Sequence, residues 1–76
     1  MLEIRPTCEQ CNKKLPFNSK EAMICTFECT FCKDCATHQF NNICPNCGGN
    51  FTERPIRPEN LLDKYPASIK IVYKPK

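Results

Sequence analysis

The sequence predicts a small α+β domain that is stapled by metal ions and contains a short hairpin and one short helix. The chain has 76 residues, of which eight are cysteine, and a short chain this rich in cysteine is built either on disulfides or on metal sites. Its cysteines come in close groups, as metal ligands do. Residues 8–51 also contain too few large apolar side chains for a core alone to hold the fold.

The start of the chain favours metal over disulfides. Residues 1–6 include acidic and basic residues and a proline where a secretory signal would have an apolar run. The sequence also has no stretch of about 18 apolar residues that would span a membrane. We therefore expect a cytoplasmic protein, in which cysteines stay reduced and act as thiolate ligands.

The eight cysteines follow the pattern C-x2-C-x13-C-x3-C-x2-C-x2-C-x8-C-x2-C. The first and the last C-x2-C pair are predicted to form metal-binding knuckles. Two intervening residues let one tight turn direct both sulfurs to one ion, with turn amides left to hydrogen-bond the thiolates. After the first pair, Asn12 suits the left-handed conformation. In the last pair, Pro45 restricts φ and Gly48 supplies a positive φ. The pairs are Cys8/Cys11 and Cys44/Cys47.

Between these pairs we expect a hairpin followed by a helix. Residues 22–26 are predicted to form the first strand of the hairpin and residues 28–31 the second strand. The helix propensity of residues 20–23 competes with the strand prediction there. Residues 32–40 predict a brief helix that ends at Asn41-Asn42. One side of this helix carries Cys32, Cys35, Ala36 and Phe40.

A knuckle, a hairpin and a helix with two cysteines in its first turn form a treble-clef arrangement. This arrangement would place one metal ion among Cys8, Cys11, Cys32 and Cys35. The second set is interleaved with the first and consists of Cys25, Cys29, Cys44 and Cys47. The prediction is therefore a cross-brace with two Zn²⁺ ions, because four thiolates are a common structural zinc site.

The cysteine spacing closely resembles the RING-finger family over residues 8–47. Cys29 stands where most members have histidine, and Pro45 lies between the last two ligands, as a proline often does there. The resemblance implies a two-zinc fold. Ubiquitin-ligase members usually have an aliphatic residue inside the first ligand pair, an aromatic residue in the later loop and a basic residue after the last ligand. Here Glu9-Gln10 lies inside the first ligand pair, the sequence has no tryptophan, and Gly48 follows the last ligand. A ubiquitin-ligase-like adaptor is therefore an alternative only.

The whole chain also resembles a family of short bacterial Cys-rich proteins classified as a domain of unknown function. The residues that carry this resemblance lie at positions 1–6, 27–32 and 44–49. It implies a fold and no activity.

Two alternatives to this ligand assignment stay open. The C-x2-C-x2-C run at residues 29–35, with the later Cys44-Pro45, is similar to a bacterial ferredoxin pattern, and the last knuckle also suits a rubredoxin-like iron. An iron or iron–sulfur redox protein would be coloured. His38 is a ninth candidate ligand, but we expect an exposed helix histidine because eight cysteines already fill two tetrahedral sites.

Catalytic motifs are missing, so we expect a non-enzymatic protein. A four-cysteine zinc site has no open coordination position for water. The sequence contains no glycine-rich phosphate loop and no H-E-x-x-H motif. We expect the scattered acidic residues to be solvated surface groups: Glu3, Glu9, Glu21, Glu28, Asp34, Glu53, Glu59 and Asp63.

The charge argues against nucleic acid as the main partner. The formal net charge of +3 becomes −1 once eight thiolates contribute −8 and two Zn²⁺ ions +4. Residues 1–51 carry five basic and five acidic residues, whereas residues 52–76 carry six and three. Weak phosphate contact is therefore expected at the tail alone, and a nucleic-acid-binding zinc finger is a minor alternative.

We divide the chain into a two-zinc module, residues 1–51, and a Pro-rich basic tail, residues 52–76. In the tail, Pro58 suits the first position of a short helix through Tyr65, and residues 69–73 alternate like a strand with one apolar face.

Two interpretations of this tail are open. It packs on the module, where Leu2 and Ile4 would pair with the strand, or it docks a partner protein. The docking residues would be Leu61, Leu62, Ile69, Ile71 and Tyr73. The predicted role is a non-catalytic zinc-binding module that mediates protein–protein interaction.

Overall fold

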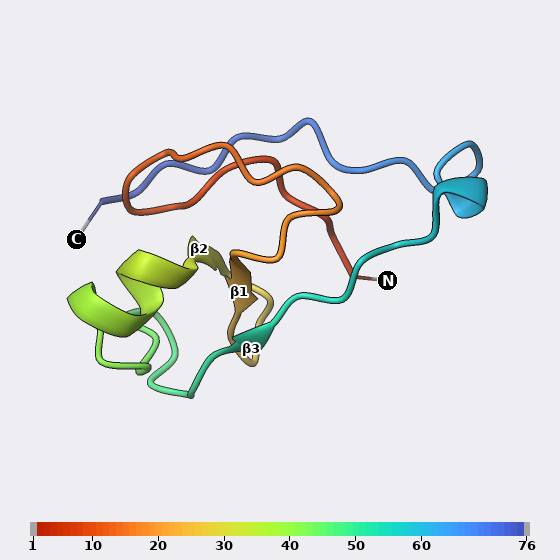
Figure 1. The fold of residues 1–76 in the computed structure, drawn as a ribbon. Helices are drawn as coiled ribbons and strands as arrows, with labels where there is room; N and C mark the ends of the chain where they lie inside the picture. The colour runs from red at the N-terminus through yellow and green to blue at the C-terminus, as the bar shows by residue number, and fades with distance from the viewer. Residues whose placement is uncertain (1, 76) are drawn as a thin grey trace.

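The computed structural model describes residues 2–75. A three-stranded antiparallel sheet in the order β2-β1-β3 lies at the centre of the fold (Figure 1). One helical turn, η1, follows β2 and packs against it. The elements are β1 (Ala22–Ile24), β2 (Thr30–Cys32), η1 (Cys35–Gln39), β3 (Thr52–Glu53) and η2 (Glu59–Leu61).

The predicted hairpin forms, with shorter strands than expected. β1 and β2 are antiparallel, with Met23 opposite Phe31, and strand rather than helix forms at residues 22–24. The first strand ends early because the chain turns around a sulfur atom. The amides of Phe27 and Cys29 both donate hydrogen bonds to the Cys25 Sγ atom at 3.3 Å.

β3 was not predicted from the sequence, and it pairs with the second edge of β1. Met23 lies opposite Glu53, and Ile24 lies opposite Thr52. A two-residue strand has too little alternation to be recognised, and Pro55 follows closely, where proline has no amide proton for the ladder. The division of the chain after residue 51 stays a prediction.

The helical segment starts one residue later than predicted, at residue 33, and its last five residues form η1. Cys32 is the last residue of β2, where it pairs with Ala22, and is not in the first helical turn. η1 is a π-helical turn in which the amide of Phe40 donates to the carbonyl of Cys35 at 3.0 Å, five residues earlier. The predicted end is confirmed, because Asn41 and Asn42 have φ values of 51° and 63°, which asparagine tolerates well.

The core is small and contains sulfur as well as hydrocarbon. Phe31 is fully buried and meets Phe40 and Phe51 edge to face, at ring-centroid distances of 5.2 and 5.4 Å. Such aromatic pairs add about 0.5–1.5 kcal/mol each beyond the area they bury. The buried cluster consists of Cys8, Leu15, Ala22, Cys25, Phe31, Cys32, Ala36, Cys44 and Phe51.

A buried arginine joins the end of β3 to the N-terminal loop. Arg54 is 3% exposed, and its guanidinium donates to the carbonyl oxygens of Arg5 at 2.8 Å, Leu15 at 3.2 Å and Pro16 at 2.9 Å. No carboxylate pairs with it within residues 2–75. Burial lowers the pKa of Arg54, and the carbonyl dipoles compensate part of the cost of burying its charge.

The tail contains less regular structure than the sequence predicts. η2 is one 3₁₀ turn that follows Pro58, and so is shorter than the helix expected through Tyr65. In the described chain, residues 69–73 do not form the expected strand. The helical turns within residues 2–75 are too short and too polar to cross a membrane.

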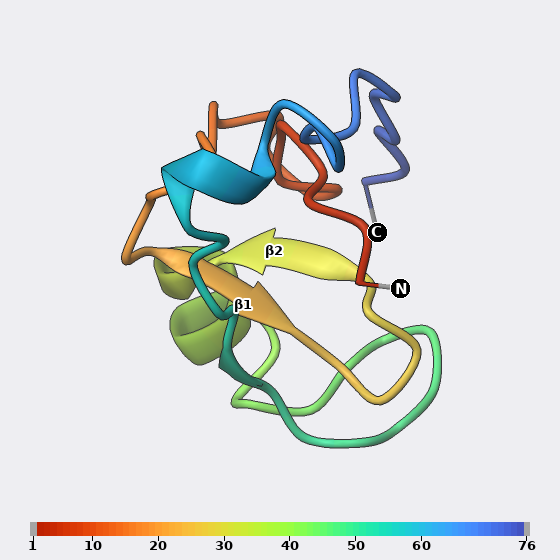
Figure 2. The ribbon, with the colours of Figure 1, turned by 90° about the vertical axis from the view of Figure 1, so that its right-hand side faces the viewer.

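The tail instead runs back along the N-terminal segment (Figure 1 and Figure 2). The amide of Ser68 donates to the carbonyl of Ile4, and the amide of Lys74 donates to the carbonyl of Glu9, both at 2.9 Å. These two bonds are too far apart to form a continuous ladder. Of the two residues expected to pair with residues 69–73, Ile4 bonds Ser68, just before that segment, whereas the carbonyl of Leu2 accepts from Arg57 Nη2.

Candidate metal centre

The structure gathers one complete set of four predicted ligands. The loop before β1 supplies Cys8 and Cys11, the end of β2 supplies Cys32, and the start of η1 supplies Cys35. Their four sulfurs all lie within 4.8 Å of one another. The Cys11 and Cys32 Sγ atoms are 3.7 Å apart, close to the separation of about 3.8 Å that tetrahedral Zn–S bonds of about 2.3 Å require.

The first knuckle has the local geometry that its sequence predicts. The amides of Gln10 and Cys11 donate to the Cys8 Sγ atom at 3.4 and 3.5 Å. Asn12 adopts φ 62°, and its amide donates to the carbonyl of Cys8 at 3.0 Å. Amides directed at sulfur stabilise the thiolate form that a metal ion needs.

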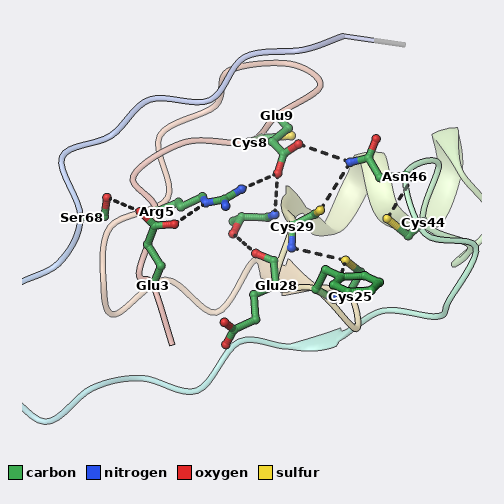
Figure 3. Close-up of polar contacts among 12 residues, drawn as sticks. Glu3, Arg5, Cys8, Glu9, Cys25, Glu28, Cys29, Cys44, Asn46 and Ser68 are labelled. Carbon is green, nitrogen blue, oxygen red and sulfur yellow. Dashed lines mark hydrogen bonds and ion pairs between the residues drawn. The ribbon is translucent and has the colours of Figure 1, made fainter. Parts of the chain in front are cut away.

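The second set is gathered only in part. The sulfurs of Cys25, Cys44 and Cys47 lie within 4.8 Å of one another, whereas Cys29 stands outside this group. The amide of Cys29 donates to the Cys25 Sγ atom, but its own sulfur accepts a hydrogen bond from Asn46 Nδ2 at 3.5 Å (Figure 3). The structure therefore brings together three of the four sulfurs predicted for this site and leaves the fourth beside them.

The second knuckle is closed by a contact with the hairpin turn. Gly48 has the predicted positive φ, 77°, and the amide of Gly49 donates to the Cys47 Sγ atom at 3.4 Å. The Thr26 hydroxyl donates to the same sulfur at 3.2 Å. A Cβ atom at Gly49 would lie 2.8 Å from Thr26 Cγ2, so any other residue here would displace the Thr26 side chain.

The ionisation of the thiols shows what charge the clusters need. Burial raises the pKa of Cys44 to about 12 and also raises that of Cys35 and Cys29. In contrast, the Thr26 hydroxyl and the Gly49 amide lower the pKa of Cys47 to about 6. Burial thus disfavours the thiolate form at most of these positions, and a divalent metal ion with soft ligands would supply the charge that compensates it.

The structure contains no cysteine pair joined as a disulfide. All eight cysteines lie within the described residues 2–75 and are free thiols. The Cys11 to Cys32 Sγ distance of 3.7 Å is far longer than the S–S bond of about 2.05 Å.

His38 belongs to neither sulfur cluster of the described chain. It lies in η1 and is exposed, as expected for a surface helix histidine.

A buried carboxylate joins the two knuckles, contrary to our expectation of a solvated surface group. Glu9 is 3% exposed, and its carboxylate accepts from Arg5 Nη1 at 2.9 Å, the amide of Thr30 at 3.1 Å and Asn46 Nδ2 at 3.5 Å (Figure 3). Asn46 Nδ2 also donates to the Cys29 Sγ atom. The available sequence signal was the position of Glu9 inside a knuckle, four residues after Arg5.

Comparison with known proteins identifies a family but no activity. Residues 1–57 match the family described as "Protein of unknown function (DUF1272)". An uncharacterized protein of Rhizobium meliloti (strain 1021) is 56% identical over 75 residues, which cover 99% of this chain and 89% of that protein. No solved structure matches. The chain therefore belongs to the DUF1272 family.

Proposed function

We propose that this protein is a non-catalytic, RING-like cross-braced module that binds two Zn²⁺ ions and presents a surface to a protein partner. The observation that carries the proposal is the Cys8, Cys11, Cys32 and Cys35 cluster, together with a second sulfur cluster interleaved along the chain. Two interleaved sites cross-link segments that the small core alone would hold weakly.

Zinc is favoured over iron by the function that the sites would serve. Sulfur tetrahedra accept either zinc or iron. Each cluster here draws its cysteines from separate loops and elements. An ion in the first would tie the N-terminal loop to β2 and η1, and an ion in the second would tie the hairpin turn to the last knuckle. This is the structural role that zinc fills in small domains.

The absence of catalysis follows from the closed ligand set of the first site. Four cysteine ligands leave no coordination position for water or substrate. Glu9, which follows Cys8 in the sequence, is already bonded to Arg5, Thr30 and Asn46, so it has little freedom to act as a general base.

A protein partner is supported by apolar side chains that the fold leaves exposed. Ile69 is 93% exposed, Ile71 62% and Tyr73 53%. Leu61 is also exposed, and Leu62 is half-buried. A contiguous patch of such side chains is typical of protein interaction sites.

Elemental analysis of untagged protein, with a visible absorption spectrum, tests the metal assignment. Two zinc ions per chain and a colourless solution are expected. Iron with charge-transfer bands would contradict it and make electron transfer the leading function. Cys11→Ala should reduce the content to one ion, whereas the exposed His38→Ala should leave two.

The partner assignment has its own test. Replacing Ile69 and Ile71 by serine should abolish capture of a protein partner from the native lysate, while metal content stays at the wild-type value. Phe27→Ser is the matched control, because Phe27 is 76% exposed on the hairpin turn. Equal capture by all three proteins would contradict docking through the tail.

A further inference from the structure

We propose that Cys25, Cys44 and Cys47 hold the second metal ion, and that Cys29 is a replaceable fourth ligand whose place a small anionic thiol can take. This inference rests on the metal binding proposed above and adds a ligand-binding site to it. It is carried by the placement of the Cys29 sulfur and by the pocket that this sulfur lines.

Cys29 is set apart from its three neighbours by geometry. Its sulfur lies outside the group in which the other three are mutually within 4.8 Å. The backbone around it is also unusual, since Glu28 adopts φ 63°, which is costly for a residue with a Cβ atom. The turn thus directs the amide of Cys29 to the Cys25 sulfur and leaves the Cys29 sulfur to one side.

Cys29 is also set apart by the donors that its sulfur receives. Two backbone amides donate to Cys25, one amide donates to Cys44, and an amide and a hydroxyl donate to Cys47. Within residues 2–75, the Cys29 sulfur receives a side-chain amide, Asn46 Nδ2, at 3.5 Å and no backbone amide. A side-chain amide is held less rigidly than a backbone amide, so the Cys29 sulfur is a less firmly oriented ligand than its three neighbours.

Cys29 lines a pocket of about 610 Å³. Its volume lies in the range of about 300–1,000 Å³ that is typical of small-molecule sites. Cys29 is the one cysteine among the residues of the described chain that line it. The wall around the sulfur is formed by Glu9, Asn46 and the tail residues 70–74, and Figure 3 shows Cys29 beside Asn46 and Glu9.

The charges around the pocket select an anion. Arg5 lines it but is paired with Glu3 and Glu9. Lys70 and Lys74 also line it, and within residues 2–75 neither ammonium group has an ion-pair partner. Because Arg5 is shared by two carboxylates, Glu3, Arg5 and Glu9 together carry −1, and Lys70 and Lys74 make the charge beside the pocket net positive.

The neighbouring sulfurs define the donor atom of that ligand. A metal ion held by three thiolates favours a soft fourth donor, and a thiolate is the softest that biology commonly supplies. A thiol that also carries a carboxylate satisfies both the metal position and the two lysines. The exchange needs no oxidant, because the proton of the entering thiol passes to the released Cys29 sulfur.

Cobalt substitution tests the site, because Co²⁺ reports its sulfur ligands in the visible spectrum. Cys29→Ala is expected to retain two Co²⁺ ions per chain with a weakened sulfur band from the second site. Cys25→Ala, the matched control, is expected to retain one. Adding 3-mercaptopropionate to Cys29→Ala should restore the band at about fivefold lower concentration than adding neutral 2-mercaptoethanol does. Adding Lys70→Ala and Lys74→Ala to the Cys29→Ala protein should remove this preference.

Alkylation of the wild-type zinc protein tests the same inference without a variant. Cys11 is more exposed than Cys29, so surface exposure alone predicts that Cys11 reacts first. We expect Cys29 to react first, with both zinc ions retained. The ratio of its reaction rate with the anion iodoacetate to its rate with neutral iodoacetamide should also be higher than the same ratio for Cys11. Mass spectrometry of digested protein locates the modified cysteine.

The outcomes separate this inference from the proposed function. A wild-type protein without metal would overturn both. Two metal ions in the wild type but one in Cys29→Ala would overturn the replaceable ligand alone, and so would initial alkylation of Cys11. Equal half-saturation by the two thiols would overturn the anionic selectivity of the pocket.

Discussion

Glu9 shows how one residue inside a knuckle serves the neighbouring knuckle as well. Its side chain bonds Arg5 and Asn46, while its carbonyl accepts the amide of Lys74 from the tail. A carboxylate with this many donors is stabilised where burial alone would disfavour it. Glu9 thereby connects the first knuckle, the second knuckle and the tail.

Replacing this carboxylate by an amide should destabilise the fold. Glu9→Gln removes the charge that Arg5 pairs with and places a donor opposite the Asn46 amide. We expect the free energy of unfolding of the metal-loaded protein to fall by about 2 kcal/mol, the range for hydrogen bonds to a charged group. Denaturant unfolding measures it. The exposed Glu21→Gln should have little effect, and equal losses in both variants would contradict a special role for Glu9.

The hairpin turn illustrates how an element is shaped by the atom that it surrounds. The amides of Phe27 and Cys29 converge on the Cys25 sulfur, and the Thr26 hydroxyl reaches the Cys47 sulfur of the last knuckle. The strands are shortened as a result. Alternation of side chains predicted the hairpin correctly, but it carries no information about where backbone amides turn toward sulfur.

The Thr26 contact predicts a site-specific loss of metal affinity. Thr26→Val removes the hydroxyl but keeps the shape of the side chain. We expect the affinity of the second site to fall by about tenfold, as for other groups that support a metal ligand, with the first site unchanged. Competition with a chromophoric chelator measures both sites. Thr37→Val, on the exposed side of η1, is the control; a loss at both sites would contradict the assignment.

Arg54 acts between elements, and its removal should therefore affect the whole fold. Arg54→Met leaves the carbonyls of Arg5, Leu15 and Pro16 without this donor. We expect a loss of about 3 kcal/mol in the free energy of unfolding, because the hydrogen bonds to a charged group are lost and the buried carbonyl of Leu15 loses its Arg54 donor.

Arg57 provides the comparison for this substitution. It donates to the carbonyls of Tyr65 and Leu2, both at 2.7 Å, and is less buried than Arg54. Arg57→Met should increase amide exchange in the tail while the sheet keeps its protection. Hydrogen exchange separates the two effects, and a similar pattern in both variants would contradict this division.

At the scale of the whole molecule, the structure depends on long-range links more than on its core. The sheet has short strands, η1 is a single turn, and the buried cluster contains four cysteines. The metal ions would therefore supply much of the folding free energy, since a structural zinc ion contributes about 10–16 kcal/mol in small peptides.

Metal removal should therefore unfold the protein. Excess EDTA is expected to abolish the circular dichroism of the sheet and the edge-to-face contacts of Phe31. Acidification should have the same result, since each thiolate takes up a proton as the pH falls and the metal affinity falls with it. Restoring zinc at neutral pH should restore the fold. A spectrum unchanged by EDTA would show that the core suffices.

Features that depend on neighbouring residues could be predicted before the fold was known. The spacing of the cysteines predicted the first cluster, Asn12 and Gly48 were recognised as residues for positive φ, and the hairpin followed from local alternation. The physical reason is that conformational preferences and short turns are encoded within a few residues.

The tertiary structure alone decided which distant groups meet. Glu9 and Asn46 lie 37 positions apart, and Arg54 and Arg5 lie 49 apart, so no local pattern reports their burial or contact. Cys29 matches the expected spacing, yet the turn that contains Glu28 holds its sulfur outside the second cluster. Such positions result from the packing of several loops at once, whereas sequence periodicity describes one segment at a time.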